Sequence, residues 1–307
     1  MSRKNDSGRI YIGISGWRYP PWRKVFYPED LTQAKELYFA SRALPSIEIN
    51  GSFYGLQRPS SYLRWYDSTP PGFVFSVKAH RYITHIRKLR EVEMPIANFL
   101  SNGLFHLKEK LGPILWQFPP SFRFDPALFE NFLRLLPHDM KSALALAERR
   151  EPKMREKEYL VIDTNRPMRH AVEIRNKSFI DLAFIDLLRK YDVALVVADT
   201  AGKWPYYEDV TSDFMYLRLH GEEELYASGY TDEALDRWAA RISAWNTGSQ
   251  PADAVLISGQ PPASLSARNV YCYFDNDIKV KAPFDARKLL RRLGLEDGLQ
   301  ELDGSRS

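Results

Sequence analysis

The sequence predicts a single (β/α)₈ barrel, an α/β fold in which parallel strands alternate with helices. Eight short apolar runs are separated by segments with helical spacing of apolar residues, a pattern typical of βαβ units. Most of these runs end in polar residues that share one face, whereas a parallel strand covered by helices normally has apolar residues on both faces. Eight strands favour closure into a barrel, and polar strand ends indicate an interior that opens into a site.

The predicted strands, in order, are Ile10–Trp17, Ser46–Tyr54, Phe73–His80, Pro113–Phe118, His170–Arg175, Val193–Asp199, Phe214–His220 and Asn269–Asp277. Side chains two residues apart in a strand point to the same side. In the seventh run, Arg218 and His220 therefore share a face, and Leu217 and Leu219 share the other. The first run continues into Ser-Gly-Trp-Arg-Tyr-Pro, which is not the glycine-rich turn that a dinucleotide-binding open sheet would carry.

The spacing of apolar residues predicts helices over Leu31–Arg42, Tyr62–Asp67, Met94–Leu111, Pro126–Leu136, Phe179–Tyr191, Asp232–Trp245 and Asp285–Leu293. Asp125 and Thr231 are the expected N-caps of two of them. Met140–Pro167 is highly charged and is predicted to be an exposed insertion, helical in part. Ala201–Asp213 has no clear helix and carries three aromatic residues, which suit a lid or a partner surface.

The length of the chain fits one barrel with short tails. A (β/α)₈ barrel takes about 250 residues, and the chain has 307. Residues 1–9 and 296–307 are polar and are predicted to be disordered tails. The barrel domain is predicted to span residues 10–295, with residues 140–167 as a charged insertion.

Composition excludes several classes of protein. A net charge of +4 with a pI of about 8.9 is only mildly basic and does not by itself indicate nucleic acid. The single cysteine, Cys272, excludes an internal disulfide and is expected to be buried in the core. No apolar stretch is long enough to span a membrane, and the first residues lack a signal sequence. The expected location is therefore cytoplasmic.

Two pairs of polar residues at strand ends suggest chemistry. Glu173 and Arg175 lie two residues apart on one strand, as do Arg218 and His220 on another. An arginine beside a histidine disfavours the protonated imidazole, and a neutral imidazole suits a general base near neutral pH. Each pair also fits a purely structural role, as an ion pair or hydrogen bond that joins layers of the barrel.

Lysine and arginine residues at the strand ends, gathered in one cleft, would bind phosphate or carboxylate. The predicted catalytic residues are His220, Glu173 and Glu48. The predicted substrate-binding residues are Trp17, Tyr19, Asn50, Tyr54, Lys78, His85, Gln117, Arg175, Arg218 and Asp275. The carboxylates of this set, with Asp199, would also suit a divalent metal, but no compact ligand motif is present, so neither a metal ligand nor a cofactor is assigned. Paired carboxylates would suit glycoside hydrolysis, although the cations are less natural for a neutral sugar.

The motifs of the chain resemble those of the DUF72 (YecE-like) family of uncharacterised TIM-barrel proteins. The resemblance covers residues 10–293 and rests on the following motifs: Gly13-Ile14-Ser15-Gly16-Trp17, Glu48-Ile49-Asn50-Gly51-Ser52-Phe53-Tyr54, Val77-Lys78-Ala79, Thr84-His85, Gln117-Phe118-Pro119-Pro120, Val172-Glu173-Ile174-Arg175, Tyr216-Leu217-Arg218-Leu219-His220-Gly221 and Tyr273-Phe274-Asp275-Asn276-Asp277. The sequence departs from the family pattern at Asn176, where histidine is usual, and at Asp275, where asparagine is more frequent. The resemblance implies a TIM barrel and no particular reaction.

The first functional hypothesis is an enzyme that acts on a small anionic substrate, phosphorylated or carboxylated, at the carboxyl-terminal mouth of the barrel. A second hypothesis is a non-catalytic barrel that binds nucleic acid or protein through its rim and the 140–167 segment. A third is a metal-dependent hydrolase or isomerase of sugar or nucleic-acid phosphates. The expected partner is a small anionic ligand; nucleic acid is possible but not indicated, a membrane is not expected, and the oligomeric state is not predicted.

Overall fold

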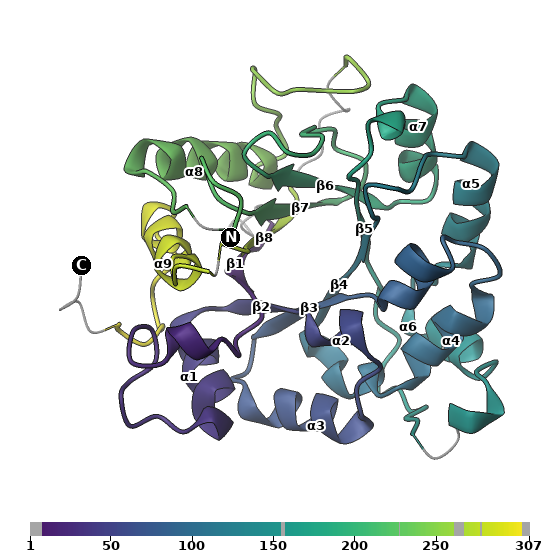
Figure 1. Cartoon of the computed structure of the whole chain (residues 1–307), viewed down its shortest axis with the longest axis horizontal. Helices are drawn as coiled ribbons and strands as arrows, with labels where there is room; N and C mark the ends of the chain where they lie inside the picture. Colours follow the sequence, from purple (N-terminus) through teal and green to yellow (C-terminus); the bar gives the residue numbers. More distant parts are fainter. Residues whose placement is uncertain (1–7, 155–156, 227, 261–266, 277, 303–307) are drawn as a thin grey trace, which may run out of the picture. The chain divides into compact units, whose positions relative to one another are not determined.

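The computed structural model describes residues 8–154, 157–226, 228–260, 267–276 and 278–302 of the chain. Its eight strands form a closed barrel in the order of the sequence (Figure 1). The strands are β1 (Ile10–Ser15), β2 (Ser46–Ile49), β3 (Val74–Lys78), β4 (Leu111–Gln117), β5 (His170–Glu173), β6 (Ala194–Asp199), β7 (Phe214–Leu219) and β8 (Asn269–Phe274). Neighbouring strands pair in parallel, for example β4 with β5 and β7 with β8. The predicted fold class is confirmed. Asp277, the last residue of the eighth predicted run, lies outside the described residues.

The chain divides into two compact units. The first unit consists of Met1–Ile47 and Ala194–Ser307, and the second of Glu48–Val193. The helices of the first unit are α1 (Glu36–Ala43), α8 (Asp232–Asn246) and α9 (Ala282–Arg292). The helices of the second unit are α2 (Gly51–Tyr54), α3 (Pro59–Ser68), α4 (Glu93–Ser101), α5 (Pro126–Leu135), α6 (Met140–Ala147) and α7 (Leu182–Lys190).

Strand β7 lies in the core of the first unit. All six of its residues are buried, as expected for a strand with the barrel interior on one side and helices on the other. The ring of Tyr216 lies 5.3 Å from that of Tyr273 on β8, and the Tyr273 hydroxyl is 2.8 Å from the Ser46 hydroxyl. Polar residues of the interior face thus hydrogen-bond one another, which offsets the cost of their burial.

One glycine of β1 is required by the close approach of a neighbouring backbone. A Cβ atom at Gly13 would lie 2.0 Å from the carbonyl oxygen of Ser46. No side chain fits in that space, so the position accepts only glycine unless the strands move apart.

The predicted helix caps are present in the structure. The Asp125 carboxylate accepts a hydrogen bond of 3.1 Å from the amide of Leu128, and the Thr231 hydroxyl accepts one of 3.2 Å from the amide of Ala234. Both satisfy a backbone N–H that the first helical turn leaves without a partner.

Two predicted elements of the second unit were wrong in extent. The run Ser46–Tyr54 is a strand only as far as Ile49, because Asn50 adopts a helical backbone and α2 follows. The Ser52 hydroxyl holds this turn in place by donating 2.6 Å to the carbonyl oxygen of Lys78, at the end of β3. The predicted helix Met94–Leu111 is interrupted after Ser101, where Gly103 has a φ of +112°, a left-handed conformation that ends an α-helix.

The segment 140–167 was predicted to be an exposed insertion, and it is partly buried instead. It begins with α6, which packs against α4 (Figure 1). Its small and apolar side chains, among them Met140, Ala143 and Ala147, are buried. The apolar face of α6 is therefore buried, although the segment around it is highly charged.

The C-terminal segment is folded against the first unit for longer than predicted. The amide of Gln300 donates 2.8 Å to the carbonyl oxygen of Arg42, and Glu296 forms ion pairs with Arg287 and Arg291. Residues 296–302 thus belong to the folded unit, whereas residues 303–307 lie outside the described residues. At the other end of the chain, residues 1–7 are also outside them, and the carbonyl oxygen of Arg9 already accepts a hydrogen bond from Val270.

Across the described residues, no helix is both long and apolar enough to cross a membrane.

Candidate functional site

The polar strand ends of the first unit form one compact group, called here the Arg218 group: Arg218, His220 and Asp275. One Arg218 Nη atom donates 2.8 Å to the Asp275 carboxylate, and the other lies 3.4 Å from Nε2 of His220. The Arg218 side chain is 1% exposed and that of Asp275 14% exposed. The buried guanidinium is therefore compensated by a carboxylate and is less available to a ligand than the sequence suggested.

The contacts of His220 select one form of its ring. A guanidinium can only donate, so Nε2 of His220 is the acceptor of the Arg218 contact and carries no proton. A neutral ring then has its proton on Nδ1, which lies 3.0 Å from the Asp275 carboxylate. The angle of this contact is poor for a hydrogen bond, and Nδ1 is otherwise without a partner among the described residues. Aromatic rings of Tyr226 and Trp204 lie 5.2 Å and 6.4 Å away, so the imidazole is screened from water.

Asp199, a carboxylate at the end of β6, has a partner that the sequence does not indicate. The Tyr230 hydroxyl donates 3.0 Å to Asp199 and accepts 3.1 Å from the amide of Gly221. Burial is the main cause that raises the pKa of Asp199, although the Tyr230 hydrogen bond acts in the opposite direction. Tyr230 directly precedes the predicted cap Thr231, and nothing in the local pattern indicates that it turns inward.

The predicted aromatic wall of the first unit is in part a packing cluster. Trp17 is buried, and its carbonyl oxygen accepts 2.6 Å from the Tyr27 hydroxyl. Tyr19 is half-buried, its hydroxyl donates to the backbone of Ser15, and its ring lies 4.7 Å from that of Trp22 at a tilt of 37°. Ser15 connects this cluster to the Arg218 group through its hydroxyl, which is 3.5 Å from Arg218.

In the second unit, Gln117, Glu173 and Arg175 meet at the ends of β4 and β5. One carboxylate oxygen of Glu173 accepts 2.9 Å from the Gln117 amide and 2.9 Å from Nε of Arg175. Glu173 is fully buried and Arg175 is 13% exposed. The expected interaction of Glu173 with Arg175 is therefore confirmed, and Gln117 adds a second donor that fixes the carboxylate.

Positive charge gathers around one aromatic ring at the end of β3. The Lys78 ammonium lies 4.3 Å and the Arg81 guanidinium 6.0 Å from the centre of the Phe53 ring, distances at which cation–π attraction operates. His85 packs edge-on against the same ring at 5.0 Å, and its Nδ1 is 2.8 Å from the Thr84 hydroxyl. We call Lys78, Arg81, His85, Glu173 and Arg175 the Lys78 group.

The charges of the Lys78 group act on His85. Burial is the largest cause, followed by Lys78, Arg175 and Arg81, and together they lower the pKa of His85 to about 4, with Glu173 acting in the opposite direction. The imidazole is therefore neutral near pH 7. Three cations and one carboxylate leave this group with an excess of positive charge.

Three other predicted residues of the second unit, Glu48, Asn50 and Tyr54, differ in exposure. Glu48 is fully buried in β2. Asn50 is half-buried, and its side-chain oxygen is without a partner among the described residues. The Tyr54 side chain is 72% exposed, so it forms part of the surface more than part of an enclosed wall.

Within the described ranges, no three His, Cys, Asp or Glu side chains lie close enough together to hold a metal ion. The single cysteine, Cys272, is buried as predicted, and burial raises the pKa of its thiol well above the usual range.

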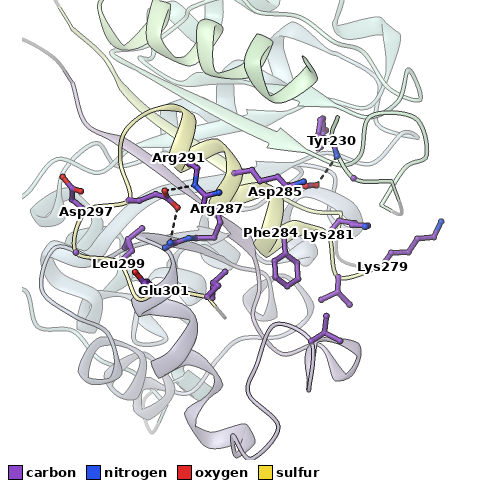
Figure 2. A pocket seen from close by; sticks show the side chains of 17 residues that line it. Tyr230, Lys279, Lys281, Phe284, Asp285, Arg287, Arg291, Asp297, Leu299 and Glu301 are labelled. Carbon is purple, nitrogen blue, oxygen red and sulfur yellow. Dashed lines mark hydrogen bonds and ion pairs between the residues drawn. The ribbon is translucent and has the colours of Figure 1, made fainter. Parts of the chain in front are cut away.

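A cavity of about 1060 Å³ lies in the first unit (Figure 2). It is bounded by α9 and by the segment 296–302, with Phe284, Leu299 and Arg287 in its lining. The ion pairs of Glu296 with Arg287 and Arg291 cross it, as Figure 2 shows. It contains none of the predicted site residues, so its size alone does not connect it with their chemistry.

The geometry defines a class of protein: a parallel β/α barrel whose strand ends carry buried, hydrogen-bonded charges. The family model described as "Protein of unknown function DUF72" matches residues 11–305, and the chain belongs to this family. The resemblance drawn from the motifs is therefore confirmed.

Relatives and solved structures agree with this assignment. The chain is 25% identical over 245 residues to the UPF0759 protein YecE of Escherichia coli K12, covering 79% of this chain and 84% of that protein. It is 32% identical over 118 residues to the UPF0759 protein YunF of Bacillus subtilis; that match covers 37% of this chain and spans only 41% of YunF. The crystal structure of the DUF72 family protein TM1631 from Thermotoga maritima is similar with a TM-score of 0.66 and 22% identity, over 93% of this chain and 99% of that one. The similarity at this identity supports the fold and leaves the activity open.

Proposed function

We propose that the protein is an enzyme that acts on a small anionic substrate, phosphorylated or carboxylated, and that the Lys78 group binds the anion. The observation that carries the proposal is the excess positive charge of this group. Lys78, Arg81 and Arg175 surround one neutral imidazole, and Glu173 is the carboxylate among them. A bound anion would offset this charge, and in a half-buried place the attraction is stronger than in water.

The fixed geometry of Arg175 supports the same conclusion. Its Nε is held by Glu173, which is itself held by Gln117. A guanidinium has five N–H donors in a planar fork. The hydrogen bond through Nε orients the fork, and an oriented guanidinium binds phosphate or carboxylate with little loss of side-chain entropy.

We assign proton transfer to His220. The Arg218 contact keeps its Nε2 unprotonated, and Asp275 lies beside the proton on Nδ1. This is the arrangement in which a neutral imidazole accepts a proton and a carboxylate stabilises the imidazolium that results. Arg218, which is buried against Asp275, is a positioning residue in this proposal.

The first test is binding of inorganic phosphate and of citrate, measured by isothermal titration calorimetry. Lys78→Met and Arg175→Met should each weaken binding at least about tenfold, the usual loss for a charge-assisted contact. Lys141→Met removes the same charge from an exposed position of α6 and serves as the matched control. Equal affinity in all four proteins would overturn the assignment of the anion site.

The second test is turnover. Phosphorylated and carboxylated metabolites that bind are incubated with the protein and followed by ³¹P and ¹H NMR. His220→Asn, which keeps a donor toward Asp275, should abolish turnover and leave the affinity for phosphate unchanged. If every ligand remains intact under all conditions, the protein is a binding barrel and the enzymatic part of the proposal is wrong.

The alternative in which the 140–167 segment binds nucleic acid is not favoured by its ion pairs. Arg149 is paired with Glu93 at 2.7 Å, Arg150 with Glu158 at 2.6 Å, and Arg166 with Asp163 at 2.7 Å. Arginines that already hold carboxylates release little free energy on meeting phosphate.

A further inference from the structure

The loop that follows β3 presents a surface of which the proposed function uses only Arg81 and His85. Residues 80–90 contain four arginine or lysine residues, two histidines and one tyrosine. The segment starts with a π-helical turn over Tyr82–Ile86, a rare element that is frequent at functional sites. Tyr54 of α2 borders it, because the His80 imidazole hydrogen-bonds the backbone of Tyr54. We call the loop and Tyr54 together the basic aromatic surface.

The backbone of the loop directs its cations into solvent. Lys88 and Leu89 both have a positive φ, and the amide of Leu89 donates 3.2 Å to the carbonyl oxygen of Ile83. This turn buries the Leu89 side chain, which is 4% exposed. Lys88 and Arg90, on either side of it, are exposed.

Three of the four cations of the surface, Arg81, Lys88 and Arg90, lack a carboxylate partner among the described residues. Arg87 pairs with Glu91, and Glu93 at the start of α4 pairs with Arg149. For Arg81, Lys88 and Arg90, no ion pair with any carboxylate exists within the described ranges. The surface therefore carries an excess positive charge that a polyanion would complement.

Exposed rings and apolar side chains lie among these charges. Tyr54 is 72% exposed, Tyr82 42% and Ile86 57%. The ring of Tyr82 lies 6.4 Å from that of His80, and that of Tyr54 lies 5.1 Å from Phe53. Exposed aromatic rings interleaved with cations are what single-stranded nucleic acids require, because bases stack on the rings and phosphates contact the cations.

We infer that the basic aromatic surface binds single-stranded nucleic acid. An acidic polypeptide would match the charge but would leave Tyr54 and Tyr82 without stacking partners. A duplex would offer its phosphates while its bases stay stacked on one another. The surface shares Arg81 and His85 with the Lys78 group, but the inference does not depend on the proposed function, because Lys88, Arg90, Tyr54 and Tyr82 carry it and none of them belongs to that group.

The test is fluorescence anisotropy of a 12-nucleotide oligothymidylate, labelled with fluorescein, at 50 and 200 mM NaCl. The length suits the usual site sizes of single-strand binding surfaces, about 4–16 nucleotides. Binding should be tighter for this strand than for a 12-base-pair duplex and than for a 12-residue polyglutamate. It should also weaken steeply with salt, because condensed counterions are released.

Paired variants locate the site. Lys88→Ala/Arg90→Ala should weaken binding about tenfold or more and reduce the slope of log K against log salt by about 1.4, the value for two lost phosphate contacts on a single strand. Tyr82→Ala should weaken it at least about fivefold and Tyr82→Phe should not, since phenylalanine also stacks. Lys35→Ala/Lys141→Ala, which removes two exposed cations elsewhere, should stay within about twofold of the unchanged protein.

Three results would overturn the inference. The first is no binding of the oligonucleotide at 50 mM salt, and the second is an equal loss in the Lys88/Arg90 variant and its control. The third is polyglutamate binding as tightly as the oligonucleotide with no effect of Tyr82→Ala, which would identify the surface as one for acidic polypeptides. Lys78→Met separates the two proposals, because it should weaken phosphate binding at least about tenfold and leave oligonucleotide binding intact.

Discussion

Replacing Glu173 by glutamine should lower stability and strengthen anion binding. The buried oxygen of Glu173 accepts two hydrogen bonds of 2.9 Å, from Gln117 and Arg175. A glutamine oxygen can accept both, but each bond loses the charge of the acceptor, a difference of about 1 kcal/mol per bond. The expected cost is therefore about 2 kcal/mol of the free energy of unfolding. At the same time the Lys78 group gains one net positive charge, and we expect phosphate to bind about fivefold more tightly, or about 1 kcal/mol.

Urea unfolding followed by circular dichroism measures the first effect, and calorimetric titration with phosphate measures the second. Glu130→Gln is the matched control, because one oxygen of Glu130 also accepts two bonds, 2.7 Å from Lys190 and 2.9 Å from Tyr191, at the surface. Solvent screens that pair, so its loss should be smaller, and the affinity for phosphate should not change.

The two effects have opposite signs, which makes the reasoning testable. A purely structural ion pair predicts lower stability of Glu173→Gln with the phosphate affinity unchanged, and that result would refute an anion site here. Weaker phosphate binding would show that the Glu173 charge positions Arg175 more than it competes with the anion. Unchanged stability would contradict the burial of Glu173 itself.

Three further predictions test other parts of the molecule. In an NMR titration the pKa of His85 should be about 4, and either Lys78→Met or added phosphate should shift it upward. Because the folded pKa lies below the ordinary value of 6.5, the unfolded chain binds this proton first, so His85 makes stability fall as the pH drops from about 6.5 toward 4. Arg218→Met should cost about 3–5 kcal/mol in urea unfolding, because it leaves the carboxylate of Asp275 largely buried without its partner; a loss below about 1 kcal/mol would show that the pair is not structural. Cys272 should not react with Ellman's reagent until the protein unfolds, since the thiol is buried and its pKa is raised; rapid labelling of the native protein would contradict this.

The sequence predicted what depends on local periodicity. Alternation within β5 and β7 correctly grouped Glu173 with Arg175 and Arg218 with His220, because side chains two residues apart on a strand necessarily share a face. The caps Asp125 and Thr231 followed from the same kind of local rule.

Contacts between distant residues could not be predicted in this way. The helical turn after Ile49 is held by the bond of Ser52 to the Lys78 carbonyl, 26 residues away. Arg218 pairs with Asp275, 57 residues away. Because of this carboxylate, we interpret Arg218 as a buried member of an ion pair and not as a residue that binds an anion. Likewise, α6 is buried because it packs against α4. The charged composition of the segment does not indicate this contact.

The two groups at the strand ends differ in charge balance, and this difference separates their roles. In the Arg218 group one guanidinium is matched by one carboxylate, both are largely buried, and the guanidinium also contacts an imidazole nitrogen and the Ser15 hydroxyl. Such a group has little to gain from an anion, since binding one would mean replacing Asp275. In the Lys78 group three cations lower the pKa of a histidine and one carboxylate opposes them. An anion there would offset the positive charge of the group. Charge removal at Lys78 and at Arg218 should therefore have different consequences, with affinity lost in the first case and stability lost in the second.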